Sequence, residues 1–217
     1  MTPIRKFWPA ALPLLSLTLP VSATGLCPLA GPNLLLDPDF AIEAENPNST
    51  HWKRARHAGV NAYRIEIEKG ELTIRKVEAQ EWFYYGQSVE VSEYKGEKMA
   101  FTAELKLDLT PVPRSYSSAP GGGLDIAARS KSGDVIWSSW RNHEPRLGKT
   151  DWVTVQVVFK VPPRARKVEL KFMHEGADGT MQVRNPSFHL VDESETPCAV
   201  TPDRSQAKDD AADPPLR

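Results

Sequence analysis

The chain has 217 residues, of which 25% are charged and 40% hydrophobic, and its formal net charge at pH 7 is −1. This length corresponds to one globular domain with tails. The near-neutral charge excludes an electrostatic case for nucleic acid, which is bound by a basic surface.

The N-terminus has the pattern of a secretory signal peptide. Arg5 and Lys6 precede an apolar run from Phe7 to Val21, and Val-Ser-Ala at residues 21–23 offers small residues for cleavage. The alternative is a membrane anchor, but the run is shorter than the roughly 20 apolar residues of a span and contains three prolines. We therefore expect residues 1–23 to be removed, which leaves no membrane span and a secreted or periplasmic protein.

Cys27 and Cys198 are the only cysteines in the chain. An even number of cysteines in an exported chain implies a disulfide, with two free thiols as the alternative. Residues 24–32 read as an irregular lead-in.

The first half of the chain contains several stretches in which apolar and polar residues alternate, as in half-buried strands. Residues 63–67 and 72–74 flank the turn Lys69-Gly70 and predict a hairpin. Residues 81–91 form the most aromatic stretch, and residues 99–109 form the cleanest alternation.

The second half repeats this pattern. Strands are expected at residues 124–128 and 135–141, joined by a turn at 131–134, and then at 153–161, 168–172 and 181–190. Gly176-Ala-Asp-Gly179 is interpreted as the turn between the last two, which gives three consecutive antiparallel strands in one sheet. With nine or ten strands and no convincing helix, the fold class is an all-β, two-sheet antiparallel sandwich. Residues 192–217 lack bulky apolar side chains, and we expect a disordered tail.

The closing strands carry a family resemblance. The motif begins with Trp152, Thr154, Phe159 and Val161-Pro162, and continues with a basic turn, Val168-x-Leu170, Gly179-x-x-x-Val183 and an apolar pair. At the other end of the domain, the segment Asn33-Leu-Leu-Leu-Asp-Pro-Asp-Phe40 looks like the family's first strand. This order resembles the β-jelly-roll carbohydrate-binding modules of the galactose-binding-domain-like group, near the modules that accompany xylanases and β-glucanases. The resemblance spans residues 33–191 and implies a sugar-binding cleft on the concave sheet or a site in the loops at its edge.

Sugar binding requires flat aromatic rings for the C–H faces of pyranoses and planar polar groups for their hydroxyls. The candidate aromatic residues are Trp82, Tyr84, Tyr85, Trp137 and Trp140. The candidate polar partners are Gln87, Glu104, Arg129 and Arg141. Four adjacent aromatic residues at 82–85 place two on each face of a strand, and Trp137 and Trp140, three apart, should lie on opposite faces.

Many members of this family hold a structural calcium between the first strand and an aspartate near the last strand. Here that last segment is Arg184-Asn185-Pro186, where an acidic pair is expected. Asp37, Asp39 and Glu43 remain as candidate oxygen ligands, and no other cofactor is expected.

The sequence contains no nucleophile elbow, zinc-binding HExxH motif or phosphate-binding loop, so we do not expect an enzyme. Our interpretation is an exported, non-catalytic protein that binds a polysaccharide or cell-surface glycan by stacking. One alternative is a protein-interaction or assembly subunit in the exported compartment, with a protein partner covering the aromatic residues and with a role in exopolysaccharide handling. Another is a glycan lyase or hydrolase on the same fold.

Overall fold

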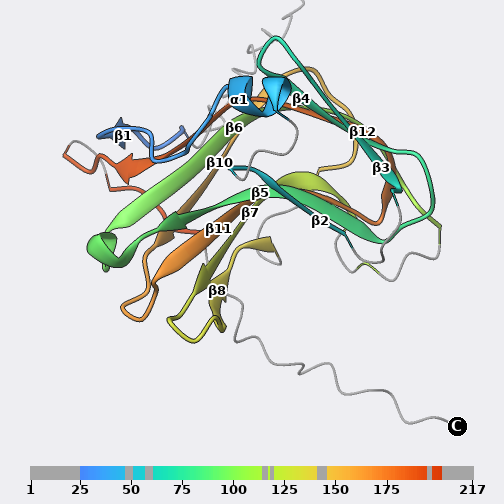
Figure 1. Cartoon of the computed structure of the whole chain (residues 1–217). Coiled ribbons are helices and arrows are strands. Elements are labelled where there is room, and N and C mark those ends of the chain that lie inside the picture. Colours follow the sequence, from blue (N-terminus) through green and yellow to red (C-terminus); the bar gives the residue numbers. More distant parts are fainter. Residues whose placement is uncertain are drawn as a thin grey trace, which may run out of the picture.

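The computed structural model describes residues 25–46, 51–56, 61–113, 117, 120–140, 146–194 and 197–201. Within these residues the chain forms two antiparallel sheets packed face to face, as Figure 1 shows, so the predicted all-β sandwich is confirmed. The predicted signal peptide lies outside the described residues. None of the described helices is long and apolar enough to cross a membrane.

The larger sheet has seven strands in the order β10-β6-β12-β4-β3, with β1 beside β12 and β9 beside β6. Its strands are β1 (Leu29–Ala30), β3 (Tyr63–Glu68), β4 (Glu71–Lys76), β6 (Lys98–Pro111), β9 (Gly148–Lys149), β10 (Val153–Lys160) and β12 (Ala177–Val191). The smaller sheet has the order β2-β5-β11-β7-β8. Its strands are β2 (Lys53–Arg56), β5 (Trp82–Glu90), β7 (Gly121–Arg129), β8 (Val135–Ser138) and β11 (Lys167–Glu175).

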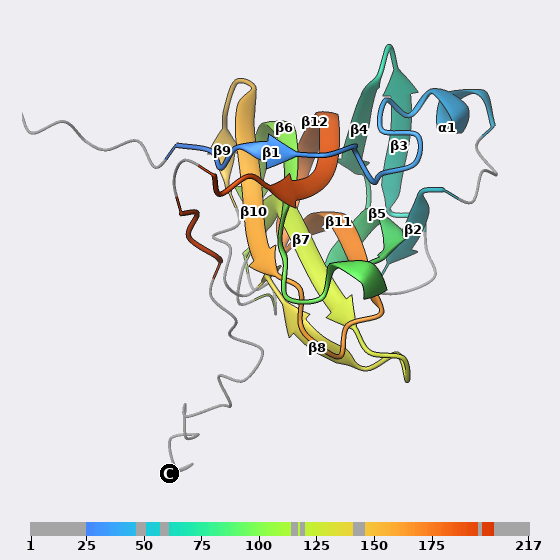
Figure 2. The ribbon, with the colours of Figure 1, turned by 90° about the vertical axis from the view of Figure 1, so that its left-hand side faces the viewer.

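Two short helices, which the sequence did not indicate, complete the described part. The helix α1 (Ala41–Glu45) lies beside β3 in Figure 2, and the 3₁₀ turn η1 (Ser92–Tyr94) links β5 to β6. The predicted first strand at 33–40 is irregular, because the Asn33 side chain instead accepts hydrogen bonds from Leu35 N (3.1 Å) and Phe188 N (3.0 Å). The first strand of the chain is instead β1, which precedes Asn33 and pairs with the C-terminal end of β12.

The last three strands do not form the predicted three-stranded unit. The strands β10 and β12 both pair with β6 in the larger sheet, whereas β11 lies between β5 and β7 in the smaller one. Gly176, with φ of 55°, lies where the chain crosses between the sheets, so the predicted hairpin turn at 176–179 is wrong. The reason is that β11 and β12 belong to opposite layers of the sandwich, and each strand buries its apolar face against the other layer.

The core between the sheets is built from the inward-facing alternate residues that the sequence pattern indicated. Phe172 on β11 is fully buried and its ring contacts Phe40, Trp52 and Phe101 from three other parts of the chain. Trp52 stacks on Tyr85 as well, with ring centroids 5.8 Å apart. Burying aromatic rings of this size contributes most of the apolar stabilisation of such a sandwich.

The predicted disulfide between Cys27 and Cys198 is present, with 5.9 Å between the Cα atoms. It lies beside β10, where the Gln156 side chain bonds both backbone groups of Cys27 at 2.7 and 3.1 Å. Backbone contact continues to Thr201, whose N–H donates to Val158 O at 2.7 Å. The remainder of the predicted tail, residues 202–217, lies outside the described residues.

His174 on β11 is fully buried between the sheets, and we expect its protonation to destabilise the fold. Its ring lies edge-on to Tyr63 at 5.1 Å, and Nδ1 is 3.5 Å from the Tyr63 hydroxyl. Burial, followed by the positive charge of Lys76, lowers the pKa of His174 from 6.5 to about 4. The folded protein therefore disfavours the protonated imidazole.

As the pH falls from 6.5 to 4, the unfolded chain binds a proton at His174 before the folded chain does, so stability decreases in this window. We expect this histidine to account for a loss of roughly 3 kcal/mol, which levels off below pH 4. Chemical unfolding at pH 4 to 7 measures it. The difference in free energy of unfolding between the wild-type protein and His174→Phe, taken at each pH, separates the effect of the histidine from that of titrating carboxylates. Parallel pH profiles for the two proteins would contradict the assignment.

Candidate functional site

The outer face of the smaller sheet carries the half-buried aromatic and charged residues of the candidate site. On β5, Phe83 and Tyr85 point into the core, and Trp82 and Tyr84 lie on the outer face. The register places Gly86 of β5 between Lys53 of β2 and Lys171 of β11. Across the next pair of strands, Lys171 lies opposite Asp125 of β7.

Trp82 and Tyr84 form one aromatic stack on this face. Their ring centroids are 6.0 Å apart and their planes differ by 8°, because residues two apart on a strand project side by side. The Lys171 ammonium lies 5.2 Å from the centroid of the Tyr84 ring, within the range of a cation–π contact. Trp82 and Lys171 thus both contact the Tyr84 ring.

A hollow of about 180 Å³ lies beside the stack, on the Tyr84 side. The hollow is lined by residues of β2, β5 and β11, which are Lys53, Tyr84, Gly86, Gln87, Ser88, Lys167, Glu169 and Lys171. A Cβ atom at Gly86 would lie 2.5 Å from Leu170 O, so a side chain does not fit there without a backbone shift. Glycine at this position leaves bare backbone as the floor of the hollow.

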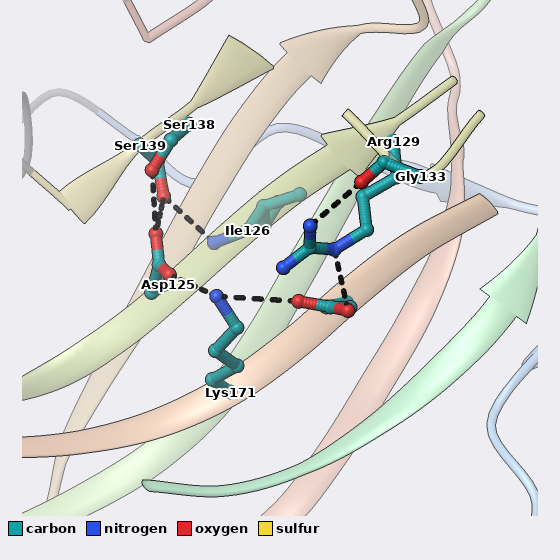
Figure 3. Close-up of polar contacts among 8 residues, drawn as sticks. Asp125, Ile126, Arg129, Gly133, Ser138, Ser139 and Lys171 are labelled. Carbon is teal, nitrogen blue, oxygen red and sulfur yellow. Dashed lines mark hydrogen bonds and ion pairs between the residues drawn. The ribbon is translucent and has the colours of Figure 1, made fainter. Parts of the chain in front are cut away.

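A chain of ion pairs crosses the same face from β7 to β11 and back (Figure 3). Asp125 accepts from Lys171 Nζ at 2.9 Å, Lys171 lies 3.7 Å from Glu169, and Glu169 accepts from Arg129 Nε at 2.6 Å. Asp125 Oδ1 also accepts from the Ser139 hydroxyl at 3.1 Å, and that hydroxyl accepts from Ile126 N. The Asp125 and Lys171 side chains are only 4% and 11% exposed, so this is a buried ion pair.

Glu169 and Arg129 favour each other's charged form. Burial by itself raises the pKa of Glu169, but the hydrogen bond from Arg129 and the nearby Lys171 charge outweigh it and lower the pKa below its usual value. The same hydrogen bond raises the pKa of Arg129. Glu169 is therefore a carboxylate and a hydrogen-bond acceptor at neutral pH.

Three of the predicted binding residues are buried instead. Tyr85 is 1% exposed because its hydroxyl donates to Glu43 and its ring stacks on Trp52. Trp137 is 5% exposed and packs on Phe159 in the core. Gln87 is 5% exposed, and its amide makes two hydrogen bonds to the backbone of Leu36. The Tyr85 and Trp137 side chains therefore belong to the core and are not available to a ligand in this structure. Gln87 still borders the hollow beside Tyr84, so its predicted ligand contact stays a prediction.

The other predicted residues are divided between the two sheets. Arg129 lies on the outer face of the smaller sheet in the ion-pair chain, and Trp140 follows β8 and is half-buried. Arg141 lies outside the described residues. Glu104 belongs to the other sheet, where hydrogen bonds from Asn185 and Arg184 lower its pKa, and it is not part of the same site.

The three candidate calcium ligands serve structural roles. Asp37 accepts from Ile42 N and Glu43 N at the start of α1, and Asp39 accepts from Ala41 N. The Glu43 oxygens accept from Trp52 N and the Tyr85 hydroxyl. Within the described ranges, no group of three or more His, Cys, Asp or Glu side chains is arranged to hold a metal ion. The calcium site stays a prediction, and in this structure the carboxylates of Asp37 and Glu43 already bind groups of the protein.

Several residues of the site were missed in the sequence. Lys167, Glu169 and Lys171 alternate with the buried Val168, Leu170 and Phe172, which indicates an outward charged row on β11. Asp125 stands alone between Leu124 and Ile126 in an apolar strand. Such a lone carboxylate in a buried strand needs a partner, and this signal was available.

Neither a protein-family model nor a curated protein matches this sequence. Among solved structures, the enzymatically active domain of bacteriophage CBA120 tailspike protein 4 aligns with a TM-score of 0.55 and 13% identity, over 73% of this chain and 21% of that one. The chain thus spans about a fifth of the tailspike domain. A CBM4 structure aligns with a TM-score of 0.51 and 14% identity, over 72% of this chain and 99% of that one. The chain therefore has the jelly-roll fold seen in carbohydrate-binding modules.

Proposed function

We propose that this protein is an exported, non-catalytic glycan-binding protein whose ligand lies across the outer face of the smaller sheet. The observation that carries the proposal is the hollow beside the Trp82–Tyr84 stack, where an aromatic wall, a bare glycine floor and fixed polar groups meet. The fold shared with a CBM4 module supports the same function.

The hollow provides the two kinds of contact that a sugar needs. The Tyr84 ring contacts both Trp82 and the Lys171 ammonium, and its remaining edge gives an apolar surface for pyranose C–H groups. The Ser88 hydroxyl can donate to or accept from a sugar hydroxyl, and Lys53 and Lys167 can donate to sugar oxygens. Because ion pairs already fix Glu169 and Lys171, little conformational entropy of these two side chains is lost on binding.

The carboxylates on this face support a binding role rather than catalysis. Asp125 and Glu169 are both held in ion pairs, and the lowered pKa of Glu169 opposes the protonated form that a general acid requires. The signal-peptide pattern of residues 1–23 and the Cys27–Cys198 disulfide support export, since disulfides persist in oxidising compartments.

Affinity electrophoresis in gels that contain soluble polysaccharides, neutral and acidic, tests the proposal. Tyr84→Ala removes the wall of the hollow and is expected to weaken retardation about tenfold. Trp152→Ala is the matched control, because that indole contacts Arg184 of the other sheet and should leave retardation unchanged.

The remaining outcomes separate the alternatives. Release of reducing ends from a retained polysaccharide would contradict a purely binding role. Absence of retardation across the panel, together with a stable complex with another exported protein, would replace glycan binding by an assembly role. Equal effects of Tyr84→Ala and Trp152→Ala would move the site away from this face.

A further inference from the structure

The hollow beside Tyr84 carries an excess of positive charge. Three lysines and one glutamate line it: Lys53, Lys167, Lys171 and Glu169. Lys171 is neutralised by Asp125 and Glu169, and Glu169 also pairs with Arg129. In the part of the chain that the structure describes, Lys53 and Lys167 have no carboxylate within ion-pair distance.

The register explains why these two lysines stay unpaired. Lys53 lies on the edge strand β2 opposite Gly86, which has no side chain. Lys167 lies opposite Glu90, but Glu90 is held by Arg166 at 3.4 Å. Both lysines therefore line the same hollow, from β2 and β11, and neither forms an ion pair with a described carboxylate, although the Lys167 charge contributes to the lowered pKa of Glu169.

The strand β2 is itself cationic, although the alternation along it directs Arg54 and Arg56 away from the face on which Lys53 lies. Three of the four residues of β2 are cationic, in the order Lys53, Arg54, Ala55, Arg56. Because the whole chain has a net charge of −1, this excess is local to one edge of the smaller sheet. A concave site lined by one sign of charge raises the local concentration of ligands of the opposite sign.

On the basis of the proposed function, we infer that the ligand is an anionic glycan, a polysaccharide whose sugar residues carry carboxylate or sulfate groups. The sugar ring packs against Tyr84, and its anionic group lies between the ammonium groups of Lys53 and Lys167. The ion pairs of Lys171 and Arg129 keep those two cations engaged within the protein, so the excess charge at the hollow comes from the unpaired lysines.

The test uses the full-length protein and matched polysaccharides that differ in charge. Polygalacturonate is compared with its methyl-esterified, uncharged form, and dextran sulfate with neutral dextran, by titration calorimetry and affinity electrophoresis at 50 and 300 mM NaCl. We expect the acidic member of at least one pair to bind at least tenfold more tightly, and its binding to weaken at the higher salt concentration. The pair that responds identifies carboxylate or sulfate as the anionic group.

The double variant Lys53→Gln/Lys167→Gln should weaken binding of the acidic polysaccharide about tenfold and reduce its dependence on salt. Lys106→Gln/Lys160→Gln removes the same charge from β6 and β10 of the other sheet and should have no effect. Equal losses in the two double variants would show only non-specific attraction and overturn the inference. Neutral polysaccharides bound as tightly as acidic ones, with loss on Tyr84→Ala, would overturn the inference but keep glycan binding. No binding to any polysaccharide would overturn both.

Discussion

Replacing Cys27 and Cys198 by serine is expected to lower the free energy of unfolding by about 5 kcal/mol. The two residues are 171 positions apart in sequence, so the bond removes a large amount of chain entropy from the unfolded state. A loss of this size corresponds to a fall of about 10–20 °C in the melting temperature for a domain of this length. Urea unfolding of the oxidised protein and of the double serine variant measures it.

Gln156→Leu provides the control for this experiment. Gln156 ties the backbone of Cys27 to β10 by two hydrogen bonds, so the variant removes the non-covalent attachment and keeps the disulfide. We expect it to cost about 1–2 kcal/mol. Unfolding midpoints that agree between the wild-type protein and the double serine variant would contradict a stabilising role for the bond.

Asp125→Ala is expected to destabilise the protein by about 3 kcal/mol, because it leaves the Lys171 ammonium buried beside only one remaining carboxylate. The Ser139 hydroxyl loses its acceptor in the same variant. Breaking one side of a buried ion pair is costly mainly because of the partner charge that stays behind. Denaturant unfolding at neutral pH measures the loss.

The double variant Asp125→Leu/Lys171→Met distinguishes this explanation from simple loss of packing. It removes both charges and fills their space with apolar groups, so most of the lost stability should return. A double variant as unstable as Asp125→Ala would show that the charge left on Lys171 is not the cause.

The strands were predictable because alternation is local. The hairpin at 63–76 and the long strand β6 follow from side chains that point alternately to opposite faces, whatever lies next to them. Sheet membership was not predictable in this way, since β10 and β11 have the same apolar alternation and belong to different sheets. Only pairing between residues far apart in sequence decides that question.

The candidate site shows the same division. Adjacent Tyr84 and Tyr85 must lie on opposite faces, but alternation does not say which one is buried. Tyr85 is the buried one because two residues distant in sequence contact it. Glu43 accepts a hydrogen bond from its hydroxyl, and Trp52 stacks on its ring. Likewise, the pair between Asp125 and Lys171 depends on the register of β7 against β11.

The disulfide also determines how the domain carries mechanical load. Cys27 precedes every described strand and Cys198 follows the last one, and their Cα atoms are 5.9 Å apart. Tension applied through the segments outside these two cysteines passes across the sulfur atoms and by-passes both sheets. A glycan held on the smaller sheet would then stay bound while the polypeptide on either side is pulled taut.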